Sequence, residues 1–149
     1  MAFMFRFRKP IDSLSLLPEG RALRSIQAPQ HVEDEDGAYR VSSAAFRPGT
    51  DQTVSVDLEQ LLTDDDLRSD TLYPSLARSV GLVAIGVDLL RAEGVAVDHF
   101  PVSTNWYHGS LTGEGLKNPG RRRRLAKACA VVVAIDHDAV AAWSPTVHN

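Results

Sequence analysis

The amino-acid sequence predicts a single α+β domain, a mainly antiparallel sheet of four to six strands with a C-terminal helix packed on one face. Three features favour this fold: a continuous apolar run at 80–87, short extended segments separated by Pro and Gly turn signals, and a helical apolar pattern at 121–135. The length of 149 residues matches one ordinary domain, so we assign the whole of 1–149 to it.

The composition is that of an ordinary globular protein. Hydrophobic residues make up 44% of the chain and charged residues 23%, which excludes wholesale disorder and fibrous repeats. No run approaches the roughly 18 apolar residues of a membrane-spanning helix, and the N-terminus lacks the pattern of a secretory leader. Cys129 is the only cysteine, so neither an intrachain disulfide nor a cysteine-based zinc site can form. We therefore expect a soluble, cytoplasmic protein that does not contact membranes.

The first segment of the chain has a period of two. Phe3, Phe5 and Phe7 alternate with an alanine, a methionine and two arginines, which predicts a strand at 1–8 with the aromatic rings on one face. Two interpretations stay open: an edge strand of the protein's own sheet, or a docking strand that adds to the sheet of a partner. The prolines and glycine that follow predict an irregular connection at 9–30 with one helical turn near 21–26.

Turn signals organise the next part of the chain. The acidic run at 33–36 followed by Gly37 is typical of a solvated turn. Segments 39–46 and 53–56 are separated by Pro48 and Gly49, which predicts a hairpin. Asp57 occupies the position of an N-cap for a short helix that follows it.

The middle and the end of the chain carry the clearest elements. Segment 80–87 predicts a buried central strand, 88–93 a helical turn ended by Gly94, and 95–100 a further strand. A last strand is expected at 106–112. The C-terminal helix is expected at 121–135; the alternative is a helix to Cys129 followed by a strand at 130–135.

The densest set of acid-base groups flanks the loop at 101–105. His99 and His108 stand on either side of it, and Asn105 and Tyr107 lie between them. Histidine is suited to general base catalysis, asparagine to donating a hydrogen bond to an oxyanion or a ribose, and tyrosine to forming a polar wall. The competing interpretation is structural, because strand alternation separates neighbouring side chains and asparagine commonly caps turns.

Other chemistry is not supported by the residue spacing. Ser42 and Ser43 lack the glycine-flanked elbow of a nucleophilic serine, and Cys129 lies among small apolar residues, as an unreactive buried thiol does. No metal-binding motif or phosphate-binding loop is present, so we expect no metal and no cofactor. Asp138 is better explained as the cap of a last helix than as a metal ligand.

A basic cluster begins the C-terminal helix: Arg121, Arg122, Arg123 and Arg124. Four guanidinium groups at a helix N-terminus oppose the helix dipole, so some counter-charge should offset them. The alternatives are a solvated helix face, an acidic protein surface, nucleic acid, or the chain's own acidic runs at 33–36 and 64–66. The net charge of -3 disfavours nucleic acid.

These patterns lead to two functional hypotheses. The first is a non-enzymatic protein-interaction subunit of a larger prokaryotic assembly, which docks through Phe3, Phe5 and Phe7 and the arginine cluster and has a protein partner or a second copy of itself. The alternative is a small hydrolase or transferase acting on a phosphorylated or nucleotide substrate, with His108, Asn105 and His99 as catalytic residues and Tyr107 and the arginines binding substrate. No motif in the sequence decides between them.

Overall fold

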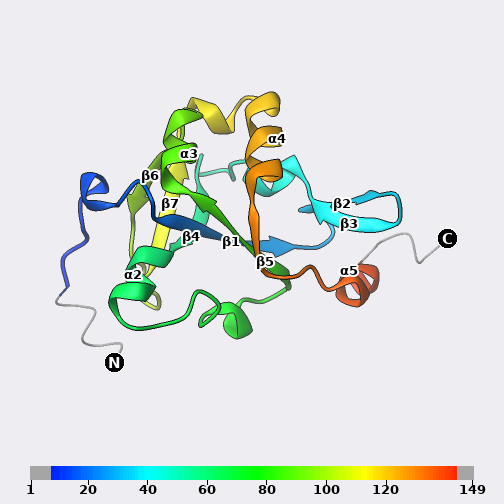
Figure 1. Cartoon of the computed structure of the whole chain (residues 1–149), viewed down its shortest axis with the longest axis horizontal. Helices are drawn as coiled ribbons and strands as arrows, with labels where there is room; N and C mark the ends of the chain where they lie inside the picture. The colour runs from blue at the N-terminus through cyan, green and yellow to red at the C-terminus, as the bar shows by residue number, and fades with distance from the viewer. Residues whose placement is uncertain (1–7, 144–149) are drawn as a thin grey trace.

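The computed structural model describes residues 8–143 and has the predicted α+β class. Its main element is a six-stranded antiparallel sheet in the order β6-β7-β4-β1-β5-β8 (Figure 1). The strands are β1 (Arg21–Gln27), β4 (Val54–Leu58), β5 (Ser79–Gly86), β6 (Ala96–His99), β7 (His108–Thr112) and β8 (Ala130–Val133). The aromatic segment with Phe3, Phe5 and Phe7 lies outside the described residues.

The two longest strands form the centre of the sheet. β5 confirms the buried strand expected from the apolar run, with its six inner residues buried. β1 pairs with it from Arg21 opposite Gly86 to Gln27 opposite Ser79, so the expectation of an irregular connection at 9–30 is wrong for this part of the chain. β1 is covered on both faces, and Arg24 and Ser25 interrupt its apolar residues. It therefore shows neither the alternation nor the continuous run that marks a strand in sequence.

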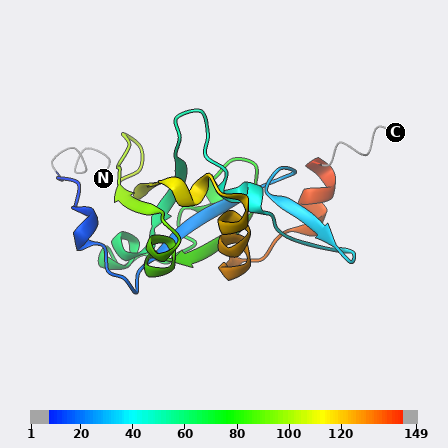
Figure 2. The same ribbon diagram turned by 90° about the horizontal axis from the view of Figure 1, so that it is seen from above.

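Helices cover both faces of the sheet (Figures 1 and 2). Above it in Figure 1 lie α3 (Val87–Ala92) and α4 (Pro119–Ala128); below it lie α2 (Glu59–Asp64) and the segment that leads into β5. α5 (His137–Trp143) contacts β5 at the far end. The core between these layers contains Leu23, Ile26, Phe46, Leu90 and Leu125, each at most 2% exposed.

The C-terminal region follows the alternative prediction. The helix ends at Ala128 and a strand begins at Ala130, instead of one helix through 121–135. Asn118 starts α4 by accepting a hydrogen bond from the Arg121 backbone at 3.0 Å, and Pro119 occupies its first turn. The run of valines after Cys129 favours extended structure, and β8 pairs with β5 at the edge of the sheet.

A separate hairpin projects beside α5 (Figure 2). It pairs β2 (Val32–Glu35) with β3 (Ala38–Val41) through a turn at Asp36 and Gly37, both with positive φ. The predicted hairpin of 39–46 with 53–56 is wrong. The chain forms a 3-10 helix at Ser43–Phe46 instead, where Ser42 Oγ accepts a hydrogen bond from the Ala44 backbone at 3.0 Å and ends the extended segment.

The hairpin is joined to α5 by a histidine. Tyr39 donates its backbone N–H to His137 Nε2 at 3.1 Å, and His137 Nδ1 donates to the Ile135 carbonyl at 3.1 Å. The Tyr39 and His137 rings lie 5.2 Å apart between centroids. The cap of α5 is Asp136, whose Oδ1 accepts from Ala139 N at 3.1 Å, and not the expected Asp138. These contacts hold the hairpin beside α5.

Candidate functional site

The loop between β6 and β7 brings Asn105 against a buried carboxylate that the sequence does not mark as functional. Asn105 Nδ2 donates to Asp57 Oδ1 at 2.7 Å, and Asn105 Oδ1 accepts from the Tyr107 backbone at 2.9 Å. The first bond joins the loop to β4, and the second closes the turn before β7. Asn105 therefore has both a structural role and a place beside an acid.

Asp57 and His108 are direct partners across the β4–β7 pairing. Asp57 is only 9% exposed, and this burial raises the pKa of its carboxyl group, while the bond from Asn105 opposes the rise, as does the charge of His108 when that ring is protonated. His108 Nδ1 donates to the Phe100 carbonyl at 2.8 Å, which leaves Nε2 as the acceptor of the neutral ring. The expected N-cap role of Asp57 is wrong, because Asp57 lies inside β4 and α2 begins at Glu59.

These side chains line a small depression, which we call the polar hollow. Its volume is about 310 Å³. Its walls are formed by Leu23, Arg24, Ser25, Gln27, Ser55, Val56, Asp57, Leu76, Ala77, Asn105 and His108. Ser25 lies opposite Leu82 on β5, so the hollow lies on the face of the sheet to which Leu82 points. The structure thus brings Asn105 and His108 to one concave surface.

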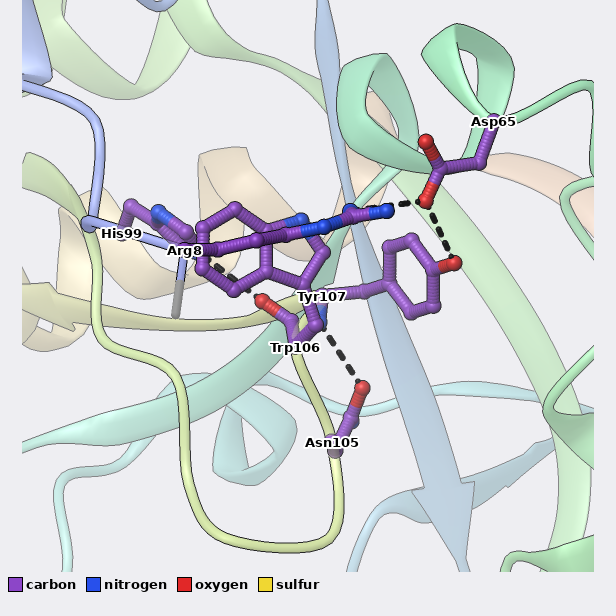
Figure 3. Close-up of polar contacts among 6 residues, drawn as sticks. All are labelled: Arg8, Asp65, His99, Asn105, Trp106 and Tyr107. Carbon is purple, nitrogen blue, oxygen red and sulfur yellow. Dashed lines mark hydrogen bonds and ion pairs between the residues drawn. The ribbon is translucent and has the colours of Figure 1, made fainter. Parts of the chain in front are cut away.

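His99 does not line this hollow. Its Nδ1 accepts a hydrogen bond from the Ile11 backbone at 3.0 Å, and its Nε2 donates to the Trp106 carbonyl at 2.7 Å (Figure 3). The ring also meets the edge of the Trp106 ring, with centroids 4.5 Å apart. Burial lowers the pKa of His99, so the neutral ring is favoured. With both nitrogens bonded to backbone groups, His99 fastens the chain before β1 to the β6–β7 loop.

Tyr107 fastens the other end of the same loop (Figure 3). Its hydroxyl donates to Asp65 Oδ2 at 2.8 Å, and Arg8 Nη1 donates to the same oxygen at 3.0 Å. The Arg8 guanidinium also lies 5.1 Å from the centre of the Trp106 ring. Burial and the Asp65 carboxylate raise the pKa of Tyr107 to about 12. Tyr107 is thus a neutral donor that joins the loop to the end of α2.

The arginine cluster is largely used within the chain. Arg121 Nη1 donates to the Glu93 carbonyl at 2.9 Å, Arg122 Nη1 donates to the Leu116 carbonyl at 2.6 Å, and Arg124 pairs with the Glu93 side chain at 2.9 Å. Arg123 differs from these three, because it lines a second concave surface. Among the alternatives considered for the arginine cluster, the structure contains a counter-charge from within the chain. That counter-charge is Glu93, not the acidic runs at 33–36 and 64–66.

We call this second concave surface the apolar groove. It has a volume of about 580 Å³ and lies between α4, β8 and the β2–β3 hairpin. Its lining is mostly apolar, with several polar and charged side chains, and consists of Glu33, Tyr39, Arg40, Val41, Ser43, Val83, Arg123, Ala126, Lys127, Cys129, Val131, Val133, Ala134, Ile135 and His137. Val83 points to the face opposite that of Leu82, so the groove and the polar hollow lie on opposite faces of the sheet.

The sequence pattern predicts only the role of a helix cap for Asp57, and it does not indicate the groove. Asp57 is 48 residues from Asn105 and only the β4–β7 pairing brings them together, so no local signal marks it. One feature of the sequence could have indicated the groove. If 130–135 is a strand, an uncharged run of valines follows directly after the basic helix. Among residues 8–143, no three His, Cys, Asp or Glu side chains are grouped so as to hold a metal ion.

Comparisons with known proteins do not add a function. No family model matches the chain, and no curated protein and no solved structure matches it. Within the described residues, no helix has the length and apolar character needed to cross a membrane. Support for a function therefore comes from the chemistry of the hollow and the groove.

Proposed function

We propose that this chain is a non-enzymatic protein-interaction subunit that binds an extended, acidic segment of a partner protein at the apolar groove. The observation that carries the proposal is β8, an edge strand whose Val131 side chain is 68% exposed beside a groove of about 580 Å³. A concave surface lined mainly by apolar side chains, with an exposed apolar strand at its edge, is typical of a binding site.

The edge of β8 is suited to strand addition. Only one side of this strand pairs with β5, so the backbone groups on its other side are not used by the sheet. Natural edge strands are usually protected by lysine, proline or a charged inward residue, but β8 consists of one alanine and three valines. Backbone hydrogen bonds from an added strand would supply affinity, and the groove would receive its alternate side chains.

The charges at the groove favour an acidic segment. Arg123 and Lys127 line it from α4, and neither forms an ion pair within residues 8–143. On the hairpin side, Arg40 and Glu33 both line the groove but are paired with each other, and Arg40 also pairs with Glu35. The two unpaired cations would therefore attract carboxylates that alternate with apolar side chains. Arg123 is the part of the sequence-predicted arginine cluster that supports this proposal.

A phosphorylated substrate fits the polar hollow poorly. The hollow contains the carboxylate of Asp57, and the Arg24 guanidinium is bonded instead to the carbonyls of Ala45 and Ser55 at 2.9 and 3.0 Å. Arg24 lines the hollow, but because its guanidinium is bonded to these carbonyls, a phosphate group would meet the repulsion of Asp57 without a free cation to offset it. This charge balance favours the interaction subunit over the hydrolase or transferase.

The test uses two short peptides of the same apolar pattern, one alternating valine with glutamate and one alternating valine with lysine. We expect the acidic peptide to shift the backbone NMR signals of β8 and to bind more tightly than the basic peptide. Arg123→Ala with Lys127→Ala should weaken it by roughly threefold or more, and Val131→Glu should weaken it further by repulsion. Arg68→Ala is the matched control, because Arg68 is 84% exposed and does not line the groove.

Val102→Glu is the control for Val131→Glu, since Val102 is also exposed but lies in the β6–β7 loop. Equal binding of both peptides would contradict the proposal, as would acidic-peptide shifts that avoid β8 and α4.

A further inference from the structure

We propose that the polar hollow is a binding site for an organic cation, an alkylammonium or alkylguanidinium group that presents at least two N–H donors. The site lies on the opposite face of the sheet from the apolar groove, so this inference does not depend on the proposed function. It rests on how Asp57 and His108 are held.

Asp57 is a buried carboxylate, and one of its two oxygens accepts no hydrogen bond from the described residues. Its side chain lines the hollow, and its residue exposure is 9%. Oδ1 accepts the hydrogen bond from Asn105 Nδ2, whereas Oδ2 accepts none from residues 8–143. A buried anion is costly unless it is paired and hydrogen-bonded. The hollow thus presents an acceptor whose charge a cation would stabilise.

No lysine or arginine in the described part of the chain pairs with Asp57. Arg24 also lines the hollow, but it lies opposite Val83, so its side chain points to the other face of the sheet, where it bonds to the Ala45 carbonyl. The groups that do affect Asp57 are Asn105, a neutral donor, and His108. A positively charged ligand could therefore serve as the counter-ion of Asp57.

His108 adds a second acceptor. Because Nδ1 donates to the Phe100 carbonyl, the neutral ring presents Nε2 as an acceptor, and Asp57 and His108 are cross-strand neighbours. Two acceptors on adjacent strands select a ligand with more than one N–H donor. Asn105 cannot turn to replace one of them, because its amide is fixed by Asp57 and by the Tyr107 backbone.

The remaining walls suit an aliphatic stem. Leu23, Leu76 and Ala77 contribute apolar surface to the hollow. Its volume of about 310 Å³ lies at the lower end of the range of ligand sites, roughly 300 to 1,000 Å³. A charged nitrogen head on a short carbon chain matches both the acceptors and this size. A metal ion matches less well, since residues 8–143 contain no group of three suitable ligands.

The first test titrates n-butylguanidinium into the full chain and follows backbone and side-chain NMR signals. We expect saturable shifts at Asp57, Asn105 and His108. Tetramethylammonium, which has charge but no N–H donor, and 1-butanol, which has the stem but no charge, should bind at least about tenfold more weakly. Equal shifts with all three probes, or no saturable shift at these residues with n-butylguanidinium, would overturn the proposal.

Two variants test the site itself. Asp57→Asn keeps the shape and the bond to Asn105 but removes the charge, and should weaken n-butylguanidinium binding by about tenfold or more. Asp98→Asn is the matched control, because Asp98 lies on β6 and does not line the hollow. Ala77→Phe, at an exposed wall position, should block entry without altering Asp57, which keeps the test decisive should Asp57→Asn fail to fold. Unchanged binding in a folded Asp57→Asn or in Ala77→Phe would overturn the proposal.

The source of the cation is distinguished by a second probe, an acetylated and amidated peptide with a single arginine between glycines. Binding of this peptide much more tightly than n-butylguanidinium would support an arginine side chain of a partner as the ligand. Equal or weaker binding of the peptide, with binding of n-butylguanidinium retained, would support a free small cation. The groove variant Val131→Glu should change neither affinity, whether or not the groove binds its peptide.

Discussion

Arg124 on α4 donates two hydrogen bonds to the carboxylate of Glu93, from Nε to Oε2 and from Nη2 to Oε1, both at 2.9 Å. Glu93 is the C-cap residue of α3, and its backbone carbonyl also accepts a hydrogen bond from Arg121. The bidentate pair fixes the orientation of α4 relative to α3. The arginine cluster, which in sequence looked like charge repulsion at a helix start, therefore joins two helices.

We predict that Arg124→Ala gives a small decrease in thermal midpoint, because the pair is bidentate but the arginine is largely exposed. Glu93→Ala should give a similar decrease, and the double variant should lose less than the sum of the two. Differential scanning calorimetry at low and high salt measures this, with Arg123→Ala as the control. An increase in midpoint on removing Arg124 would show instead that relief of the helix dipole outweighs the pair.

The raised pKa of Asp57 predicts a specific pH dependence. Burial makes the folded state hold the carboxyl proton more tightly than the unfolded state, so wild-type stability falls as the pH rises from about 4 through the raised pKa. In Asp57→Asn the side chain at position 57 does not ionise, so this pH-dependent loss of stability is absent. The free energy of unfolding of this variant relative to wild type should therefore increase with pH in that window, by at most about 1.4 kcal/mol per pH unit, and then level off.

Urea unfolding between pH 3 and 8 measures the difference, with Asp98→Asn on β6 as the control. A difference between Asp57→Asn and wild type that is flat across this range would contradict the inferred cost of ionising the buried carboxyl group.

The parts of the fold that sequence predicted are those with a local physical cause. The apolar run of β5 requires burial, and Gly94, with φ +78, ends the segment after α3 where other residues are strained. β1 could not be found in this way. Arg24 looks incompatible with a central strand until the carbonyls of Ala45 and Ser55 are in place to accept its hydrogen bonds. Those partners come from distant segments, so the signal is not in the strand itself.

The candidate site was also predictable only where the cause is local. The polar loop identified Asn105 and His108 because their types are unusual at that density, and both line the hollow. His99 shares their composition but is turned to backbone partners, Ile11 and Trp106, which sequence spacing does not reveal. Asp57 enters the hollow through strand pairing alone. Local composition can therefore locate a polar region, whereas the long-range register decides which side chains face one another.

Cys129 provides a chemical probe of the groove. Burial raises the pKa of its thiol to about 12, so very little thiolate is present near neutrality. We predict that alkylation by iodoacetamide at pH 8 is far slower than for free cysteine, and that the logarithm of the rate rises linearly with pH up to at least pH 10. Bound acidic peptide should slow the reaction further, because Cys129 lines the groove. A rate that levels off near pH 8.5 would mean that the thiol is solvated.

His31 should make the protein sensitive to mild acid. Its Nδ1 accepts a hydrogen bond from the Gln27 backbone at 3.1 Å, and burial, assisted by the charge of Arg24, lowers its pKa to about 4. Between about pH 6.5 and 4, His31 is protonated in the unfolded chain but stays neutral in the folded chain. The free energy of unfolding is therefore at its full value above this window and decreases as the pH falls through it. The loss should reach about 3 kcal/mol at pH 4.

His31→Asn tests this directly, because the asparagine Oδ1 can accept the same backbone hydrogen bond without titrating. We expect the variant to be less stable than wild type at pH 7, owing to the smaller buried side chain, but to lose less stability between pH 6.5 and 4. Chemical unfolding followed by circular dichroism at closely spaced pH values compares the two slopes. Parallel slopes would show that His31 is protonated in the folded state, and that the bond to Gln27 is exchanged for another partner in acid.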